Sequence, residues 1–301
     1  MPGAERVLDF SLGQAHLALR LRQLLIRREG MPDVSVPMED IAVVVLASRQ
    51  STCTLGALDG LMGAGAAVIV CDDSMLPSGL MLPLAGHFNQ TKRMLAQATA
   101  KEPVRKRIWQ QIVQAKVRAQ GSLLASFRSQ DAGLSSLAKS VRSGDPSNVE
   151  SHAAQRYWPL LFGPDFRRRH DAPDQNRLLN YGYAVLRAAV GRALCSAGLH
   201  PSLGVHHHSR SDPYCLADDL MEPYRPVIDG EVAVIAGETG CDTPLDPATK
   251  ARLVGTLHER LSHDGESRTI FDWISRSANS LAQCICGQER RVFFPRGLIE
   301  P

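Results

Sequence analysis

Three histidines in succession are followed, about a dozen residues later, by a cluster of acids. The segment GVHHHSRSDPYCLADDLMEPYRP, residues 204–226, places His206–His208 ahead of Asp218, Asp219 and Glu222. Imidazole nitrogens and carboxylate oxygens both bind metal ions, so the segment has the composition of half a metal site. The alternative is a hydrated loop followed by an ordinary helix start, where the helix dipole favours acids.

A second acid with two interpretations is Glu150, in the segment GDPSNVESHAAQRYW. It comes three residues after Ser147, which is the spacing of a capping box at a helix start. In the competing interpretation its carboxylate points into a cleft, with Ala153 and Ala154 leaving room beside it. The sequence alone keeps both interpretations open.

These groups form a metal site only if they converge in the fold. Asp219 and Glu222 are three residues apart and share a helix face, while an extended histidine run turns alternate rings to opposite sides. A site of Glu150, one histidine, Asp219 and Glu222 is rich in oxygen and has no thiolate, which favours Mg²⁺ or Mn²⁺. Such an ion activates phosphodiester chemistry.

Two kinds of element are predicted to position these residues. Up to residue 85 the chain holds the strand-like runs HLALRLRQLLIRRE, IAVVVLAS and AAVIVCDD. From residue 86, apolar residues recur three and four apart, for example in AAQRYWPLLFG, ARLVGTLHERLSH and TIFDWISRSANSLAQCICG, with a break at residues 167–177. We therefore predict an α+β protein with a small N-terminal β-rich domain, residues 1–85, and a larger mainly α-helical catalytic domain, residues 86–301.

The composition fits an ordinary globular enzyme. The 301 residues are 44% hydrophobic, and no apolar run approaches the roughly 20 residues of a membrane span. The seven cysteines are scattered without a CxxC pair, which indicates reduced thiols and argues against a zinc site. We expect a cytoplasmic protein with no membrane association.

Positive charge is concentrated in residues 91–120, which hold eight Lys or Arg and one acid. Such a basic strip is commonly a solvated helix face. If the substrate is an anionic polymer, the strip supplies contacts to its backbone. The candidate DNA-binding residues are Lys92, Arg93, Arg105, Lys106, Arg107, Lys116 and Arg118.

Three ordered segments closely resemble a known family. SNVESHAAQRYW, then NRLLNYGYAVLRAAVGRALCSAGLHPSLGVHHHSRS, then LADDLMEPYRPVID are similar to the CRISPR-associated integrase that acquires new spacers, in its type II form. The family patterns N-x-E-x-x-A-A, G-x-x-H and D-L-x-E fall on Glu150, His207 and Glu222. The resemblance implies that these three are the catalytic metal ligands, with Asp219 as a fourth group near the cation. The choice between His206 and His207 stays open.

The resemblance also implies an activity and an assembly. The expected enzyme is a DNA endonuclease and integrase dependent on Mg²⁺ or Mn²⁺, which joins 3′-hydroxyl ends of captured double-stranded DNA to a CRISPR repeat by transesterification. Its β-rich domain is expected to form a homodimer, and two dimers to flank a small dimeric second adaptation protein in a heterohexamer. The type II effector nuclease is a further expected partner. The alternatives are a stand-alone structure-selective nuclease and a non-catalytic DNA-binding scaffold.

Overall fold

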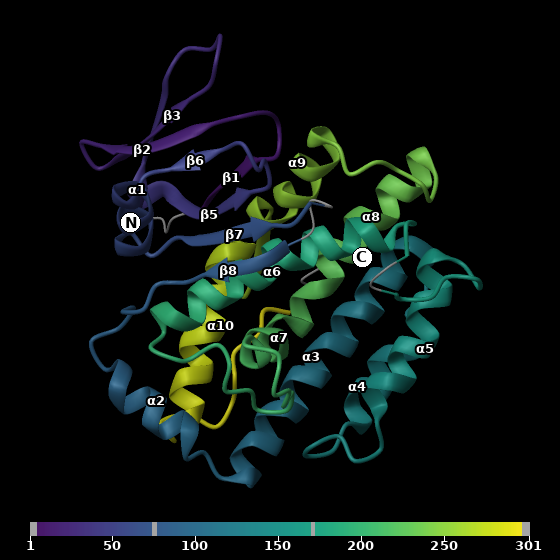
Figure 1. Cartoon of the computed structure of the whole chain (residues 1–301). Coiled ribbons are helices and arrows are strands. Elements are labelled where there is room, and N and C mark those ends of the chain that lie inside the picture. Colours follow the sequence, from purple (N-terminus) through teal and green to yellow (C-terminus); the bar gives the residue numbers. More distant parts are fainter. Residues whose placement is uncertain (1–4, 74–76, 170–171, 297–301) are drawn as a thin grey trace.

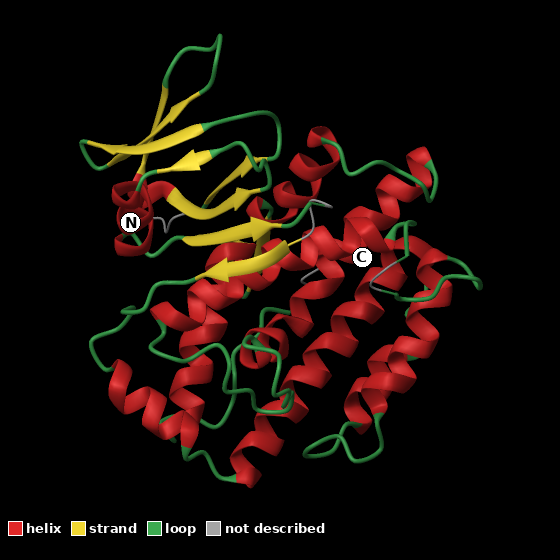
Figure 2. Cartoon of the chain, viewed as in Figure 1, coloured by secondary structure: helices red, strands yellow, loops and turns green. Residues whose placement is uncertain are grey.

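The computed structural model describes residues 5–73, 77–169 and 172–296 (Figure 1). Most strands gather at the N-terminal end and most helices follow them, as Figure 2 shows. The predicted α+β class is confirmed. Residues 170 and 171 of the predicted break at 167–177 lie outside the described ranges. The first four residues of the predicted N-terminal domain and the last five of the predicted C-terminal domain also lie outside them.

The first sheet has three parallel strands and one antiparallel edge strand. Its order is β1 (Arg6–Phe10), β5 (Ile41–Leu46), β7 (Ala67–Cys71) and β8 (Pro77–Met81). The central strand β5 is a continuous apolar run, IAVVVL, which is typical of a strand covered on both faces. The sheet is therefore an inner layer of the molecule.

The second sheet closes the outer side of the N-terminal part. Its order is β4 (Val34–Pro37), β3 (Gln23–Arg27), β2 (His16–Arg20) and β6 (Thr52–Cys53), and helix α1 (Leu55–Gly63) packs against β2. The β2–β3 hairpin turns at Leu21 and Arg22, both with positive φ. Glycine or asparagine usually fills such a turn, so the sequence carried no clear signal for the turn.

The first sheet lies between two apolar cores, one on each of its faces. On β5, Val44 faces the N-terminal core, while Val43 and Val45 belong to the large core formed by the helices. Alternate residues of a strand point to opposite faces, which explains the division. The predicted boundary at residues 85 and 86 falls between β8 and α2 (Gln90–Ala98) and stays a prediction, because the large core continues across it.

The helical part is built around two long helices, α3 (Glu102–Arg128) and α6 (Asn176–Ser196). Helix α3 runs through the middle of this part in Figure 1, and α6 lies beneath the first sheet. The other helical elements are α4 (Leu134–Ser140), α5 (Val149–Phe162), α7 (Cys215–Met221), η2 (Glu222–Tyr224), α8 (Arg225–Thr239), α9 (Pro247–Gly255), η3 (Thr256–His258) and α10 (Ile270–Ile285). Helix α3 contacts α4, α5, α7, η2, α8 and α10 and so forms the common support of the acids.

One helical prediction is wrong in part. The segment ARLVGTLHERLSH, residues 251–263, continues α9 only to Gly255 and ends in strand β9 (Arg260–His263), which pairs with β10 (Glu266–Thr269). Asp264 and Gly265 both have positive φ, as an Asp-Gly hairpin turn requires. Among the described helices, none combines the length and apolar character needed to cross a membrane.

Candidate metal and nucleic-acid site

Glu150 lies in the first turn of α5, and its side chain does not take part in the helix cap. The cap comes from Asp145, whose carboxylate accepts the backbone N–H groups of Val149 at 2.9 Å and Glu150 at 3.0 Å. The capping-box interpretation, with Ser147 as the cap, is therefore wrong. Because Asp145 satisfies these amides from outside the helix, Glu150 is available to face α3.

Lys116 of α3 brings two of the predicted ligands together. Its Nζ lies 2.6 Å from Glu150 Oε1 and 2.5 Å from Glu222 Oε2. The side chains of Lys116 and Glu222 are only 13% and 6% exposed. Residues that are separated by more than seventy positions in the chain thus share one ammonium group in a largely buried setting.

The second oxygen of Glu222 is paired with Arg225. Arg225 Nε lies 3.1 Å from Glu222 Oε1, and the guanidinium sits over the ring of Tyr183 at 4.6 Å from its centroid. Burial acts to raise the pKa of Glu222, but Arg225 and Lys116 outweigh it and lower that pKa to about 2. Glu222 is therefore a carboxylate over the whole physiological pH range.

Asp219 is fully buried and holds the histidine loop. Its Oδ2 accepts the backbone N–H of Val205 at 2.6 Å and of His206 at 3.0 Å, and its Oδ1 accepts the N–H of His207 at 3.2 Å. The same Oδ1 lies 2.6 Å from Nδ1 of the His207 ring. Since an ionised carboxylate only accepts, His207 carries its proton on Nδ1, and Nε2 is the nitrogen left for a metal.

Two histidines of the run lie against Trp109 of α3, not on opposite sides of an extended strand. The His206 ring stacks on the indole with centroids 4.0 Å apart, and His207 meets it edge-on at 5.6 Å. Burial lowers the pKa of His206, whereas the hydrogen bond to Asp219 raises the pKa of His207. Glu222 and Glu150 also raise it, which places His207 in the field of both carboxylates.

The structure thus places Glu150 and Glu222 on one ammonium of α3, with His207 close enough for both carboxylates to raise its pKa and with Asp219 hydrogen-bonded to His207. Within the described ranges, no three His, Cys, Asp or Glu side chains already stand in the arrangement of a metal cage. The position of Lys116 explains why the two glutamates do not form such a cage, since its ammonium lies between them. Sequence reasoning counted Lys116 as a DNA contact and did not foresee this position.

The basic strip does not form one face. Lys106 pairs with Glu102 near the start of α3 and is about half exposed, whereas Arg93 of α2 donates to the Ala197 carbonyl at 2.8 Å. Arg105 lines a hollow beside His207. Lys92 is exposed on α2, Lys116 is turned to the glutamates, and Arg107 and Arg118 point into a separate groove.

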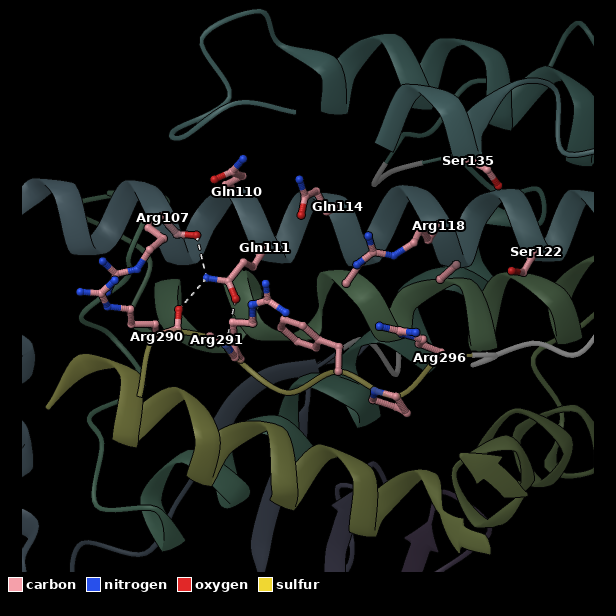
Figure 3. Close-up of a pocket in the computed structure, with 15 residues that line it drawn as sticks. Arg107, Gln110, Gln111, Gln114, Arg118, Ser122, Ser135, Arg290, Arg291 and Arg296 are labelled. Atoms are coloured by element: carbon pink, nitrogen blue, oxygen red, sulfur yellow. Dashed lines mark hydrogen bonds between the residues drawn. The ribbon is translucent and has the colours of Figure 1, made fainter. Parts of the chain in front are cut away.

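That groove runs between α3 and the C-terminal segment 290–296 (Figure 3). It has a volume of about 850 Å³ and is lined by five arginines, with no acid among the described residues that line it. These arginines are Arg107, Arg118, Arg290, Arg291 and Arg296. Gln111 fixes the segment, because its side-chain oxygen accepts the N–H of Val292 at 2.9 Å. Arg290, Arg291 and Arg296 are not among the predicted DNA contacts, although the run RRVFFPR is basic.

Comparison with known proteins shows the family. Residues 12–239 match the model of the family described as CRISPR associated protein Cas1. A CRISPR-associated endonuclease Cas1 from Neisseria meningitidis is 41% identical over 271 residues, covering 88% of this chain and 87% of the relative. The chain therefore belongs to the Cas1 family. Its prediction as a CRISPR-associated endonuclease is confirmed.

Solved structures share the fold at low identity. A casposase bound to an integration product superposes with a TM-score of 0.78 at 22% identity, covering 98% of this chain and 94% of that one. The chain of a Cas6-RT-Cas1–Cas2 complex gives 0.75 at 20% identity, covering 97% of this chain and 36% of that one. The architecture described above is thus the Cas1 fold.

Proposed function

We propose that the chain joins 3′-hydroxyl ends of captured double-stranded DNA to a CRISPR repeat by metal-dependent transesterification. The observation that carries this proposal is the convergence of Glu150 and Glu222 on one ammonium, with His207 in the field of both. Three residues far apart in the sequence are thereby held beside one another, as a metal-dependent phosphodiester chemistry requires.

The ligands that fit a divalent ion are Glu150, His207 through Nε2, and Glu222. The donors are mostly oxygen with one imidazole, which suits Mg²⁺ or Mn²⁺. In the described part of the chain, Glu222 Oε2 is a buried carboxylate oxygen that faces the Lys116 ammonium at 2.5 Å, so it stands in a position suited to a cation. For Asp219 we revise the predicted role: its oxygens accept four hydrogen bonds, so it orients His207 instead of binding the ion.

When bound, a divalent ion polarises a phosphoryl oxygen and stabilises the charge that builds up on the attacking and leaving oxygens. The chain prepares the ligands for this chemistry. Arg225 and Lys116 keep Glu222 ionised, and Asp219 keeps the His207 proton on Nδ1. Trp109 supports the ring of His206 next to it. An incoming 3′-hydroxyl exchanges one phosphodiester for another, so the reaction needs no protein-bound intermediate.

The arginine-lined groove between α3 and segment 290–296 supports DNA binding outside the reacting centre. Five guanidinium groups, with no acid among the described residues that line the groove, match a sugar-phosphate backbone and do not read the base sequence. Arg118 and Arg296 line the same groove, and burial together with the Arg296 charge lowers the pKa of Arg118. An anionic strand in the groove relieves this repulsion.

The assembly proposed from the resemblance is a homodimer formed by the N-terminal part, with two dimers around a small dimeric second adaptation protein. The fold shared with a chain from a Cas6-RT-Cas1–Cas2 complex supports this partner class. We further propose the type II form, an effector nuclease as an additional partner, and action in the cytoplasm. The lack of a membrane-spanning helix among the described residues agrees with that location.

A joining assay tests the proposed function. The chain and its small partner are incubated with Mn²⁺, a short duplex bearing 3′-hydroxyl ends and a supercoiled plasmid carrying the repeat. We expect joined and nicked plasmid from the wild type and none from Glu150→Gln or Glu222→Gln, with unfolding midpoints measured for each variant. Fragments without joining would support the stand-alone nuclease, and full activity in both folded variants would support the scaffold.

A further inference from the structure

Lys116 occupies the space between the two glutamates that a divalent ion needs. Its Nζ contacts one oxygen of Glu150 and one of Glu222, and Arg225 contacts the other oxygen of Glu222. Both oxygens of Glu222 are therefore already paired with cations. A divalent ion that uses this carboxylate must weaken or replace one of these pairs.

The two cations differ in how firmly they are held. Arg225 is planar and rests on the ring of Tyr183, whose hydroxyl donates to the buried Asp229. Lys116 is a point charge on a flexible four-carbon stem, and no aromatic ring lies against its ammonium among the described residues. Lys116 is consequently the cation that can leave, while Arg225 stays with Glu222.

We propose that Lys116 is an internal counter-ion that a divalent cation displaces, and that the released ammonium then pairs with a DNA phosphate. This inference rests on the ligand set of the proposed function. It couples metal loading to DNA binding: without DNA the ammonium competes for the glutamates, and with DNA it has another anion to pair with. By linkage, each ligand then increases the affinity of the other.

Lys116 stabilises the metal-free protein and weakens metal binding, and both effects follow from charge alone. Without any cation, Glu150 and Glu222 are two carboxylates facing the same small space, and their repulsion opposes folding. Lys116 removes this repulsion in the metal-free protein. The same ion pair weakens metal binding: the apparent association constant equals the intrinsic one multiplied by the fraction of molecules in which the ammonium has left.

Mn²⁺ binding to the full chain measures the competition directly, through the electron paramagnetic resonance signal of free Mn²⁺. We expect Lys116→Met to bind Mn²⁺ at least about tenfold more tightly than the wild type in the absence of DNA. It should also unfold at lower temperature without metal and gain more from added Mn²⁺. Lys139→Met, an exposed lysine on α4, is the matched control and should equal the wild type.

A second measurement uses only the wild type and covers the case in which Lys116→Met fails to fold. A duplex with 3′-dideoxy ends cannot be joined, and its addition should tighten Mn²⁺ binding about tenfold. Unchanged Mn²⁺ affinity with the duplex, or affinity in folded Lys116→Met no tighter than in the wild type, overturns the displacement. Glu150→Gln separates the two proposals: if it binds Mn²⁺ as the wild type does, the ligand set itself is wrong.

Discussion

Replacing Asp219 with asparagine tests whether this carboxylate holds the histidine loop. The substitution keeps the shape of the side chain and removes its charge. In the wild type the two oxygens accept three backbone N–H groups and the Nδ1 proton of His207, at 2.6 to 3.2 Å. In Asp219→Asn one oxygen becomes an NH₂ group, which must face at least one of these donors.

The expected loss follows from the number and charge of these bonds. A hydrogen bond to a charged group contributes about 1.5–3 kcal/mol, and a neutral one roughly half of that. One donor loses its acceptor and the remaining bonds become neutral, so we expect the free energy of unfolding to fall by about 2–4 kcal/mol. For a chain of 301 residues, that corresponds to a fall of roughly 3–6 °C in Tm.

Urea unfolding of the wild type, Asp219→Asn and Asp218→Asn measures this loss. Asp218 is the matched control, because it is the adjacent buried acid, and its carboxylate accepts a hydrogen bond from Arg187 Nε at 2.7 Å and interacts with the side chain of Asp212. Burial raises the pKa of Asp218 to about 6, so its charge is already disfavoured. We expect Asp218→Asn to change the free energy of unfolding by less than about 1 kcal/mol.

Equal effects of the two substitutions would refute the reasoning, as would an Asp219→Asn protein within about 0.5 kcal/mol of the wild type. A second readout separates loop positioning from general stability. Because the Asp219 hydrogen bond selects the His207 tautomer, folded Asp219→Asn should bind Mn²⁺ about 10- to 100-fold more weakly. Folded protein with unchanged Mn²⁺ affinity would show that the tautomer does not matter.

Three further predictions follow from the same contacts. The pKa of His207 is raised in the folded protein, so its ion pair with Asp219 stabilises the fold fully below the ordinary histidine pKa of 6.5 and progressively less as pH rises through the folded pKa. In urea unfolding, the difference in free energy of unfolding between the wild type and Asp219→Asn should therefore shrink at alkaline pH. Gly204→Ala places a Cβ 2.3 Å from the His207 carbonyl oxygen and should cost more than about 1 kcal/mol, whereas Gly237→Ala, with open space around it, should not destabilise. Replacing the three arginines of segment 290–296 with alanine should weaken DNA binding on all sequences and flatten its salt dependence in filter binding; a loss confined to one sequence would contradict backbone contact.

The elements were largely predictable from the pattern of apolar residues. The apolar run of β5 and the periodic segments of α5 and α10 appear where the sequence predicts them. The β9–β10 hairpin was missed because LVGTLHERL also fits helical spacing, and the Asp-Gly turn that interrupts it was not weighed. Short apolar runs are ambiguous in this way until tertiary packing selects one period.

Motifs named the ligands of the candidate site, which stay a prediction, whereas no sequence pattern indicated the residues that contact them. Glu150, His207 and Glu222 came from motifs, and the structure gathers them. The contacts of these residues depend on the direction of each side chain. Lys116 and Arg118 are two positions apart in one basic run, yet Lys116 contacts the two glutamates and Arg118 lines the arginine groove. A helix turns 100° per residue, so charge clustered in the sequence is dispersed around α3.

The alternation along β5, with Val44 facing one core and Val43 and Val45 the other, has a mechanical consequence. If this sheet rotated relative to the helices, buried apolar side chains on both of its faces would be exposed. The sheet and the helices packed on it therefore move together as a rigid unit. A molecule that binds the outer sheet therefore also fixes the orientation of Glu150 and Glu222. In an assembly, the distance between two such pairs of glutamates then depends on where the outer sheets are bound.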